Sequence, residues 1–376
     1  MIKKSILIFS ILLFSNQFIN AQDDTTDSDS LSTFAKFNKK AERFFKVFPV
    51  PIVSYSEEAG QILGLAKFNA FQLSKKDTIS KPSKISGAVS FSSKGRININ
   101  IANDLILKEN KYMILSRFNY KKQPEYLLGI GNDVSIDDVE KVTTDKIEFN
   151  TVAMIRVFNN FYAGIAIDIT DYIKVETDST SFLIEDMVSG LNGGTDFGLG
   201  FSFVYDSRDN RYNAHSGALI KSSFLYYDKS LGSAYQFNRA EIDARNYFNP
   251  WLKHVIALQV TTTALDGDVP FYDLALLGGG NKMRGFYEGA IRDNILVDTQ
   301  VEYRLPIWKI FGAVGWVGTG RVYESYNDLI LKDFWLSYGG GLRIKVDSEN
   351  DINLRIDAGF RPTGEVAIYF NFAEAF

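Results

Sequence analysis

Apolar and polar residues alternate along most of the chain beyond residue 60. In the segment 297–305, every second side chain is charged or an amide, while the intervening ones are mostly apolar. The polar set is Asp298, Gln300, Glu302 and Arg304. Segments 235–248 and 352–360 repeat this two-residue period. Such a period is the signature of a β-strand with one oily and one polar face, so the chain is predicted to be all-β.

The alternation predicts sixteen strands separated by turn residues. They are expected near 60–73, 84–94, 96–107, 111–121, 124–132, 146–158, 160–174, 195–206, 216–228, 234–248, 251–265, 293–306, 309–323, 334–347, 351–361 and 365–376. An even count returns both chain ends to one side of a closed barrel. On this count the short turns at Lys94-Gly95, Asn159-Asn160, Asn249-Pro250 and 347–351 face the periplasm. The longer connections 133–145, 175–194 and 266–292 face outward.

A soluble β-sandwich also alternates, so period alone does not separate it from a membrane barrel. The strands are about ten residues or longer, as a tilted membrane strand requires. The chain contains 30 Phe and 19 Tyr, which would supply aromatic girdles at the membrane interfaces. The last segment carries alternate aromatics and ends in Phe376, which resembles the assembly signal of outer-membrane barrels. We therefore predict a sixteen-stranded transmembrane antiparallel β-barrel.

The N-terminal region is predicted to fall outside the barrel. Residues 1–21 combine Lys3 and Lys4, a short apolar run and Ala21, which is typical of a secretory signal peptide. Residues 22–58 are predicted to be a short periplasmic leader, with an acidic flexible tail followed by an amphipathic helix at 32–48. That helix could plug the barrel, lie on the inner leaflet or bind a partner. The barrel itself is assigned to 59–376.

Composition excludes several classes of function. A formal net charge of -4 without an extended basic cluster argues against nucleic-acid binding. With no cysteine, the chain cannot form disulfides, thiolate metal sites or a lipoprotein anchor. His215 and His254 are the only histidines, and neither is placed beside a plausible serine nucleophile. Neither an enzyme nor a cofactor is expected, and the acidic residues near 266–273 indicate a solvated edge rather than a metal site.

The most distinctive segment is GGGNKMRGFYEGAIRD, residues 278–293, with Arg284-Gly285-Phe286 at its centre. Glycine beside an arginine lets the backbone pass close to another chain segment. A sixteen-stranded barrel leaves a polar lumen. We therefore expect this long extracellular loop to fold back into the lumen.

On these residues the chain resembles the BamA/TamA/FhaC superfamily of outer-membrane assembly and secretion barrels, from about residue 48 to 376. Supporting motifs are YDSRDNRYNAHSG at 205–217, VEYRLPI at 301–307 and YGGGLRIKV at 338–346. The resemblance implies that Arg284 docks against acidic inner-wall residues, for which Glu302 and Asp357 are the candidates.

The chain also departs from the superfamily's pattern. Gly318 stands where relatives often carry an acidic residue, which makes Asp357 the stronger candidate partner. Residues 22–60 leave no room for a POTRA domain. Asp206, Arg208 and Asp209, in a predicted periplasmic turn, are expected to make local turn hydrogen bonds.

The resemblance implies an outer-membrane protein that inserts, assembles or translocates proteins or lipids. Its expected partners are outer-membrane lipid, client proteins and possible further copies of itself. The implied seam joins the strands at 60–73 and 365–376, and its candidate residues are Gly60, Gly64, Phe372 and Phe376. Gly60 and Gly64 would weaken the pairing of the first strand, and an opened seam would offer an edge to an incoming strand. For the junction, the alternative is an ordinary closed seam. For the function, the alternative is an outer-membrane channel or an oligomerising scaffold that has no client proteins.

Overall fold

The computed structural model describes residues 48–56, 60–74, 76–135, 139–177, 181–185, 187–348, 350–362 and 366–376. The predicted signal peptide and the predicted amphipathic helix, apart from its last residue, lie outside the described residues. In the described ranges, no helix is long and apolar enough to cross a membrane.

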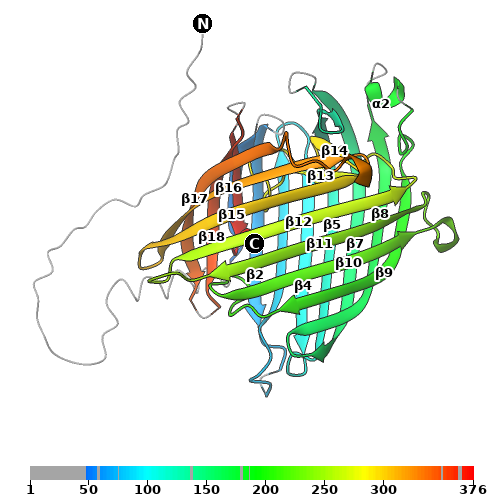
Figure 1. Ribbon diagram of the computed structural model, residues 1–376. Helices are drawn as coiled ribbons and strands as arrows, with labels where there is room; N and C mark the ends of the chain where they lie inside the picture. The colour runs from blue at the N-terminus through cyan, green and yellow to red at the C-terminus, as the bar shows by residue number, and fades with distance from the viewer. Residues whose placement is uncertain are drawn as a thin grey trace, which may run out of the picture. The chain divides into compact units, whose positions relative to one another are not determined.

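Sixteen antiparallel strands form one continuous sheet that winds into a barrel of tilted strands (Figure 1). In sheet order they are β1 (Val50–Ser56), β2 (Gly60–Phe71), β3 (Ser83–Ser92), β4 (Ile97–Leu107), β5 (Tyr112–Leu127), β7 (Glu140–Phe158), β8 (Phe161–Glu176), β9 (Gly194–Asp206), β10 (Gly217–Tyr227), β11 (Phe237–Phe248), β12 (Val255–Gly267), β15 (Ile295–Trp308), β16 (Phe311–Tyr323), β17 (Trp335–Asp347), β18 (Ile352–Phe360) and β19 (Val366–Phe372). Sheet order follows sequence order throughout, as an up-and-down barrel requires.

The two faces of the barrel wall are inverted relative to a soluble protein. On β15 the polar set Asp298, Gln300, Glu302 and Arg304 is buried, whereas Val301 between them is 41% exposed. Phe201 on β9 is 61% exposed in the same way. A soluble sandwich would bury the apolar face and expose the charges. The inversion is that of a membrane barrel with a polar interior, and it confirms the predicted fold class.

The first strand of the barrel was not predicted from the sequence. β1 lies in the predicted leader and pairs with β2 over its full length, so the barrel begins by Val50 rather than at residue 59. The compensating error is at β5, which runs unbroken through Pro124 where two strands were predicted. Pro124 sits inside a ladder with β7, at a position opposite Thr143. The count of sixteen is therefore right, but its first members are shifted by one.

This shift reverses the placement of one turn. Lys94-Gly95 joins the third and fourth strands, so it lies at the barrel end opposite Asn159-Asn160, which joins the sixth and seventh. The prediction that both face the periplasm was wrong. We call the end that carries 128–139, 177–193 and 268–294 the loop end, and the other the turn end.

Short elements decorate the loop end. They are β6 (Gly129–Ile130), α2 (Phe182–Glu185), η1 (Lys229–Leu231), β13 (Ala275–Leu277), β14 (Ile291–Asp293) and η2 (Tyr326–Asp328). β6, β13 and β14 form a small separate sheet at this end, and Figure 1 labels β13 and β14 in the upper part of the barrel. Since β14 belongs to the distinctive glycine-rich segment, this sheet ties that segment to the loop after β5.

Candidate functional site

The connection 268–294 between β12 and β15 turns into the barrel instead of projecting from it. Its residues Leu277, Met283 and Phe286 join a buried cluster with inward-facing side chains of the wall, including Tyr227 and Leu296. The connection is held in an antiparallel ladder between β13 and β14. The apolar packing and the ladder bring the tip of the loop, Arg284, onto the inner wall.

Arg284 lies on the inner wall with no exposed surface. Its Nη1 donates to Asp357 at 2.7 Å, and its Nη2 donates to Glu302 at 2.6 Å. The guanidinium carbon lies 3.7 Å from the centre of the Trp316 ring. Glu302 and Asp357 are also fully buried. These are the two carboxylates named from the sequence, and a buried pair of charge-assisted hydrogen bonds is a strong anchor.

The carboxylates are shared with other arginines of the wall. Asp357 also accepts from Arg343 Nη1 at 2.6 Å, and Glu302 accepts from Arg304 Nε at 2.9 Å. Arg355 lies 3.6 Å from Asp357 and donates to the main-chain oxygen of Gly280 at 2.9 Å. Arginine is suited to such a site because its planar fork can bond several acceptors while keeping its charge. The docked loop is thus part of a network spanning β15, β17 and β18.

Close backbone approach explains the glycine after Arg284. Gly285 has φ +117, and a Cβ there would lie 2.8 Å from the carbonyl oxygen of Phe360. A Cβ on Gly359 would in turn lie 2.7 Å from the carbonyl of Arg284. The main-chain N–H of Gly285 donates to the Tyr369 hydroxyl at 3.0 Å. Two glycines on facing segments therefore let the loop backbone lie directly on β18.

The absence of a side chain at Gly318 leaves space beside Gln300 and Met283. A Cβ at this position would lie 3.1 Å from the Cβ of Gln300 and 3.6 Å from the sulfur of Met283. A Cβ on Gly320, two residues along the same face, would lie 3.4 Å from Met283 Cγ. The small residues make room for the methionine next to Arg284. A larger acidic side chain at position 318 would occupy the space that Met283 fills.

A second anchor holds the returning limb of the loop. Arg292 is buried, donates to the main-chain oxygens of Gly289 and Phe271, and lies 3.4 Å from Glu125 on β5. β14 also pairs in parallel with β6. The loop therefore contacts the wall on both sides, at β15–β18 through Arg284 and at β5 through Arg292.

Asp273, near the start of the loop, has a side chain that is 10% exposed and interacts with the carboxylates of Asp196 and Asp168. Its Oδ1 lies 3.5 Å from Arg239. Burial raises the pKa of Asp273 to about 7; Arg239 opposes this shift, and the carboxylates of Asp196 and Asp168 add to it. The packing of the loop start therefore favours the protonated acid.

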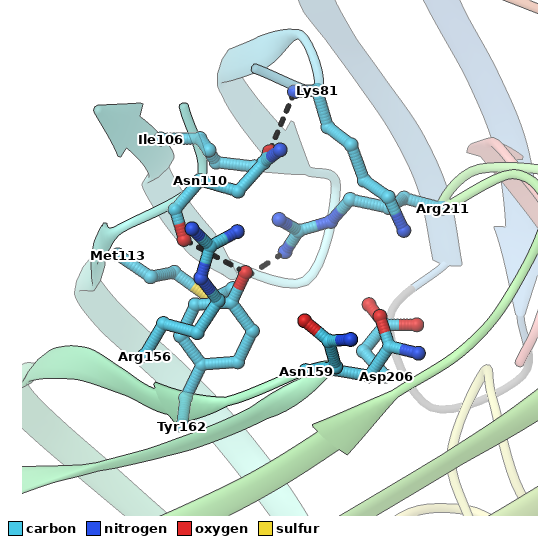
Figure 2. Close-up of a pocket in the computed structure, with 10 residues that line it drawn as sticks. Lys81, Ile106, Asn110, Met113, Arg156, Asn159, Tyr162, Asp206 and Arg211 are labelled. Atoms are coloured by element: carbon cyan, nitrogen blue, oxygen red, sulfur yellow. Dashed lines mark hydrogen bonds between the residues drawn. The ribbon is translucent and has the colours of Figure 1, made fainter. Parts of the chain in front are cut away.

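Asp206, Arg208 and Asp209 bond within their own turn. Arg208 makes a two-pronged contact with Asp206, at 2.8 and 2.9 Å. Asp209 Oδ1 accepts from the main-chain N–H groups of Asn210, His215 and Ser216. Asp206 also lines a small cavity at the turn end (Figure 2). This segment forms the turn hydrogen bonds expected from its sequence.

The predicted seam residues are placed differently from expectation. Gly60 and Gly64 belong to β2, and Gly64 pairs with β1 on one side and β3 on the other. They do not lie on an edge strand, because β1 takes that position. Phe372 closes β19, but Phe376 is buried against Tyr247, Val255 and Ala257, on the far wall. The seam prediction was therefore wrong for Gly60, Gly64 and Phe376.

Several contacts of the site had no signal in the sequence. Trp316, Ser337 and Tyr369 contact Arg284 or Gly285 from three different strands. Their alternation marks them as strand residues, but period alone does not say which one meets the loop. In the described ranges, no three acidic or histidine side chains are grouped so as to hold a metal ion.

The comparison with protein families decides the identity of this barrel. The Omp85 superfamily domain matches residues 66–347, which is most of the chain. The chain belongs to the Omp85 superfamily. The resemblance noted in the sequence is confirmed, and the docked arginine loop lies within the matched range.

Solved structures agree with this Omp85 assignment at the level of fold. The barrel is similar to BamA from Haemophilus ducreyi lacking POTRA domains 1-3, with a TM-score of 0.52 and 14% identity over 93% of this chain and 80% of that chain. It is also similar to CdiB from Escherichia coli, with a TM-score of 0.55 and 11% identity over 91% of this chain and 70% of that chain. No curated protein matches this sequence. Family and fold together indicate a bacterial outer-membrane protein of the assembly and secretion class.

Proposed function

We propose that this Omp85 barrel inserts, assembles or translocates client proteins at the outer membrane through the junction of β1 and β19. The proposal rests on the hydrogen bonding of this junction, which differs from that of the other strand pairs. Every other neighbouring pair in the sheet order is hydrogen-bonded, whereas β1 and β19 are the two ends of that order. They nevertheless lie in contact. Within the sixteen-stranded sheet, this is the one junction of neighbouring strands that has no ladder among the described residues.

An unpaired edge has a direct chemical consequence. When the two edges separate, their backbone N–H and C=O groups can pair with an incoming strand, which adds to the sheet by main-chain hydrogen bonds. In lipid such groups must be satisfied, so an open edge favours pairing with any strand that arrives. Both edge strands are short, at 7 residues each, against 13 or more in β9, β12 and β15. A short junction is easier to separate than the long ladders elsewhere.

The docked loop supports assembly over the alternative of an open channel. Its two arginine anchors contact opposite parts of the wall, so the segment 268–294 crosses the lumen. A steady ion conductance of the purified protein in planar bilayers would favour the channel. The proposal predicts small, flickering conductance instead.

A disulfide across the junction tests the proposal. The chain has no cysteine, so one cysteine in β1 and one in β19 can be introduced without background, scanning β19 for the position that cross-links. The control pair is Ser222→Cys with Ile242→Cys, which are ladder partners on β10 and β11. Oxidised junction variants should lower the abundance of outer-membrane or secreted proteins in cells, and reduction should restore it. Unchanged abundance with a fully formed junction disulfide would refute the proposal.

A further inference from the structure

A cavity of about 70 Å³ lies at the turn end of the barrel, away from the arginine loop. Its lining comes from four connections and the strand ends beside them. These residues are Lys81, Ile106, Asn110, Met113, Arg156, Asn159, Asn160, Tyr162, Asp206 and Arg211. One water needs about 10–15 Å³ of such space, so the cavity has room for a group of several heavy atoms.

The cavity is rich in positive charge. Lys81, Arg156 and Arg211 line it against one carboxylate, Asp206, and both oxygens of that carboxylate are occupied by Arg208. Figure 2 shows the guanidinium groups of Arg156 and Arg211 turned toward the Tyr162 hydroxyl. Like charges brought together in a partly enclosed site repel, so the arrangement favours an anion between them.

Arg211 has poor partners for a buried arginine. Its side chain is 10% exposed, its Nη2 lies 3.7 Å from Asp104 and 4.0 Å from the sulfur of Met113, and its Nη1 has no hydrogen-bond acceptor among the described residues. A buried guanidinium N–H without an acceptor is costly. A bound oxyanion would supply that acceptor.

Lys81 adds a further positive charge to the cavity. Its ammonium donates to the main-chain oxygen of Arg208 at 3.2 Å, a contact that brings no negative charge. Burial lowers the pKa of Lys81, Asp206 opposes this shift, and Arg211 and Arg208 lower the pKa further. The site therefore carries more positive than negative charge, since Lys81, Arg156 and Arg211 line it with the single carboxylate of Asp206.

The walls of the cavity are held in place independently of any ligand. Asn110 Oδ1 accepts from the main-chain N–H of Lys81 at 2.7 Å, and the Tyr162 hydroxyl donates to the main-chain oxygen of Asn110 at 2.9 Å. These bonds join the connection 72–82 to the turn after β4 and to β8. The cations are thus presented by a preformed frame, which lowers the entropic cost of binding.

We propose that this cavity binds a doubly charged phosphate group, either free phosphate or a phosphate monoester on a lipid headgroup. Phosphate with a free second ionisation carries about two negative charges at neutral pH and offers several strong acceptor oxygens. Arginine forks match those oxygens in pairs, and lysine adds a further point charge. A phosphodiester has one charge fewer and suits the site less well.

The test uses the full chain folded in detergent micelles or in lipid nanodiscs. Inorganic phosphate is titrated by calorimetry at low salt, and nanodiscs with phosphatidic acid are compared with nanodiscs containing phosphatidylglycerol. The variants are Arg211→Gln and Arg156→Gln. The matched control is Lys253→Gln, which removes one exposed cation from another connection at the same end. Heat-dependent gel migration verifies that each barrel is folded.

Binding should weaken about tenfold or more in both arginine variants, as expected for loss of a charged hydrogen bond, and stay unchanged in the control. Arg156→Lys should retain more affinity than Arg156→Gln. Binding of inorganic phosphate identifies the free anion as a ligand, whereas binding to phosphatidic acid alone identifies a lipid source. The proposal is overturned if neither probe binds, or if Lys253→Gln weakens binding as much as the arginine variants.

Discussion

Replacing Arg284 with alanine removes the tip of the docked loop and leaves two buried carboxylates short of a cation. Both carboxylates, Glu302 and Asp357, have no exposed surface and each receives a hydrogen bond of 2.6–2.7 Å from Arg284. The variant should release the loop from β15 and β18 while the barrel wall stays folded. The wall depends on its ladders, and Arg284 is not part of them.

The magnitude follows from the contacts. Hydrogen bonds to charged groups contribute about 1.5–3 kcal/mol each, and a desolvated cation–π contact such as that with Trp316 adds about 2 kcal/mol. Arg304 and Arg343 still donate hydrogen bonds to Glu302 and Asp357, so they neutralise part of the negative charge that Arg284 leaves behind. Breaking one side of a buried ion pair typically costs about 3–5 kcal/mol, and we expect the loop-opening free energy to fall by about that amount.

Hydrogen exchange of residues 278–293 in the folded barrel measures this loss directly. A fall of about 4 kcal/mol corresponds to roughly a thousandfold faster exchange. The matched control is Arg321→Ala, because Arg321 bonds main-chain oxygens and Asp333, which is 65% exposed. If Arg284→Ala leaves exchange in the loop within a factor of three of the wild-type protein, the reasoning on the buried network is refuted.

Further predictions concern the close packing at Gly359, the pH dependence that Asp273 gives the loop, and the turn that Asp209 holds. Gly359→Ala should speed exchange of the loop as Arg284→Ala does, because its Cβ would lie 2.7 Å from the carbonyl of Arg284, while Gly87→Ala, with 3.7 Å to its nearest atom, should have no effect. For Asp273, the folded pKa of about 7 lies above the ordinary value of 3.8, so the protonated acid favours the folded loop. The free energy that keeps the loop start folded should therefore be full below pH 3.8 and fall by up to about 1.4 kcal/mol per pH unit between pH 3.8 and 7. Protection of residues 268–277 from hydrogen exchange should decrease over the same range. A pH dependence that persists in Asp273→Asn would contradict the assignment to Asp273. Asp209→Ala removes the shared acceptor of three main-chain N–H groups that shape this turn, and it should slightly lower the temperature of heat-dependent gel migration, whereas Asp266→Ala, on an exposed strand end, should not.

Most strands could be predicted from the sequence because the alternation that marks a barrel strand lies within the strand itself. Each strand carries its own alternation, so β8 to β12 and β15 to β18 were placed near their observed positions without knowledge of their neighbours, whereas β7 begins at Glu140, inside the predicted loop 133–145. β1 was missed because Pro51 within it, Pro49 just before it and the serines at its end hide its alternation, and pairing with β2 is what makes it a strand. β5 failed in the opposite way: Pro124 reads as a break, but its partner strand carries the ladder past it.

The fold class and the polar lumen could be predicted from the sequence alone, because they follow from alternation and charge within short segments. The two carboxylates that meet Arg284 were expected only because the arginine loop resembles that of a known superfamily. The three-dimensional arrangement was needed to show which strands form the edges, what packs against Gly318, and where Phe376 lies. Each of these depends on segments far apart in the chain: β1 against β19, Met283 over β16, and Phe376 against β11 and β12. A one-dimensional pattern does not specify such contacts, because the same alternating strand fits many neighbours and closure of the barrel selects among them.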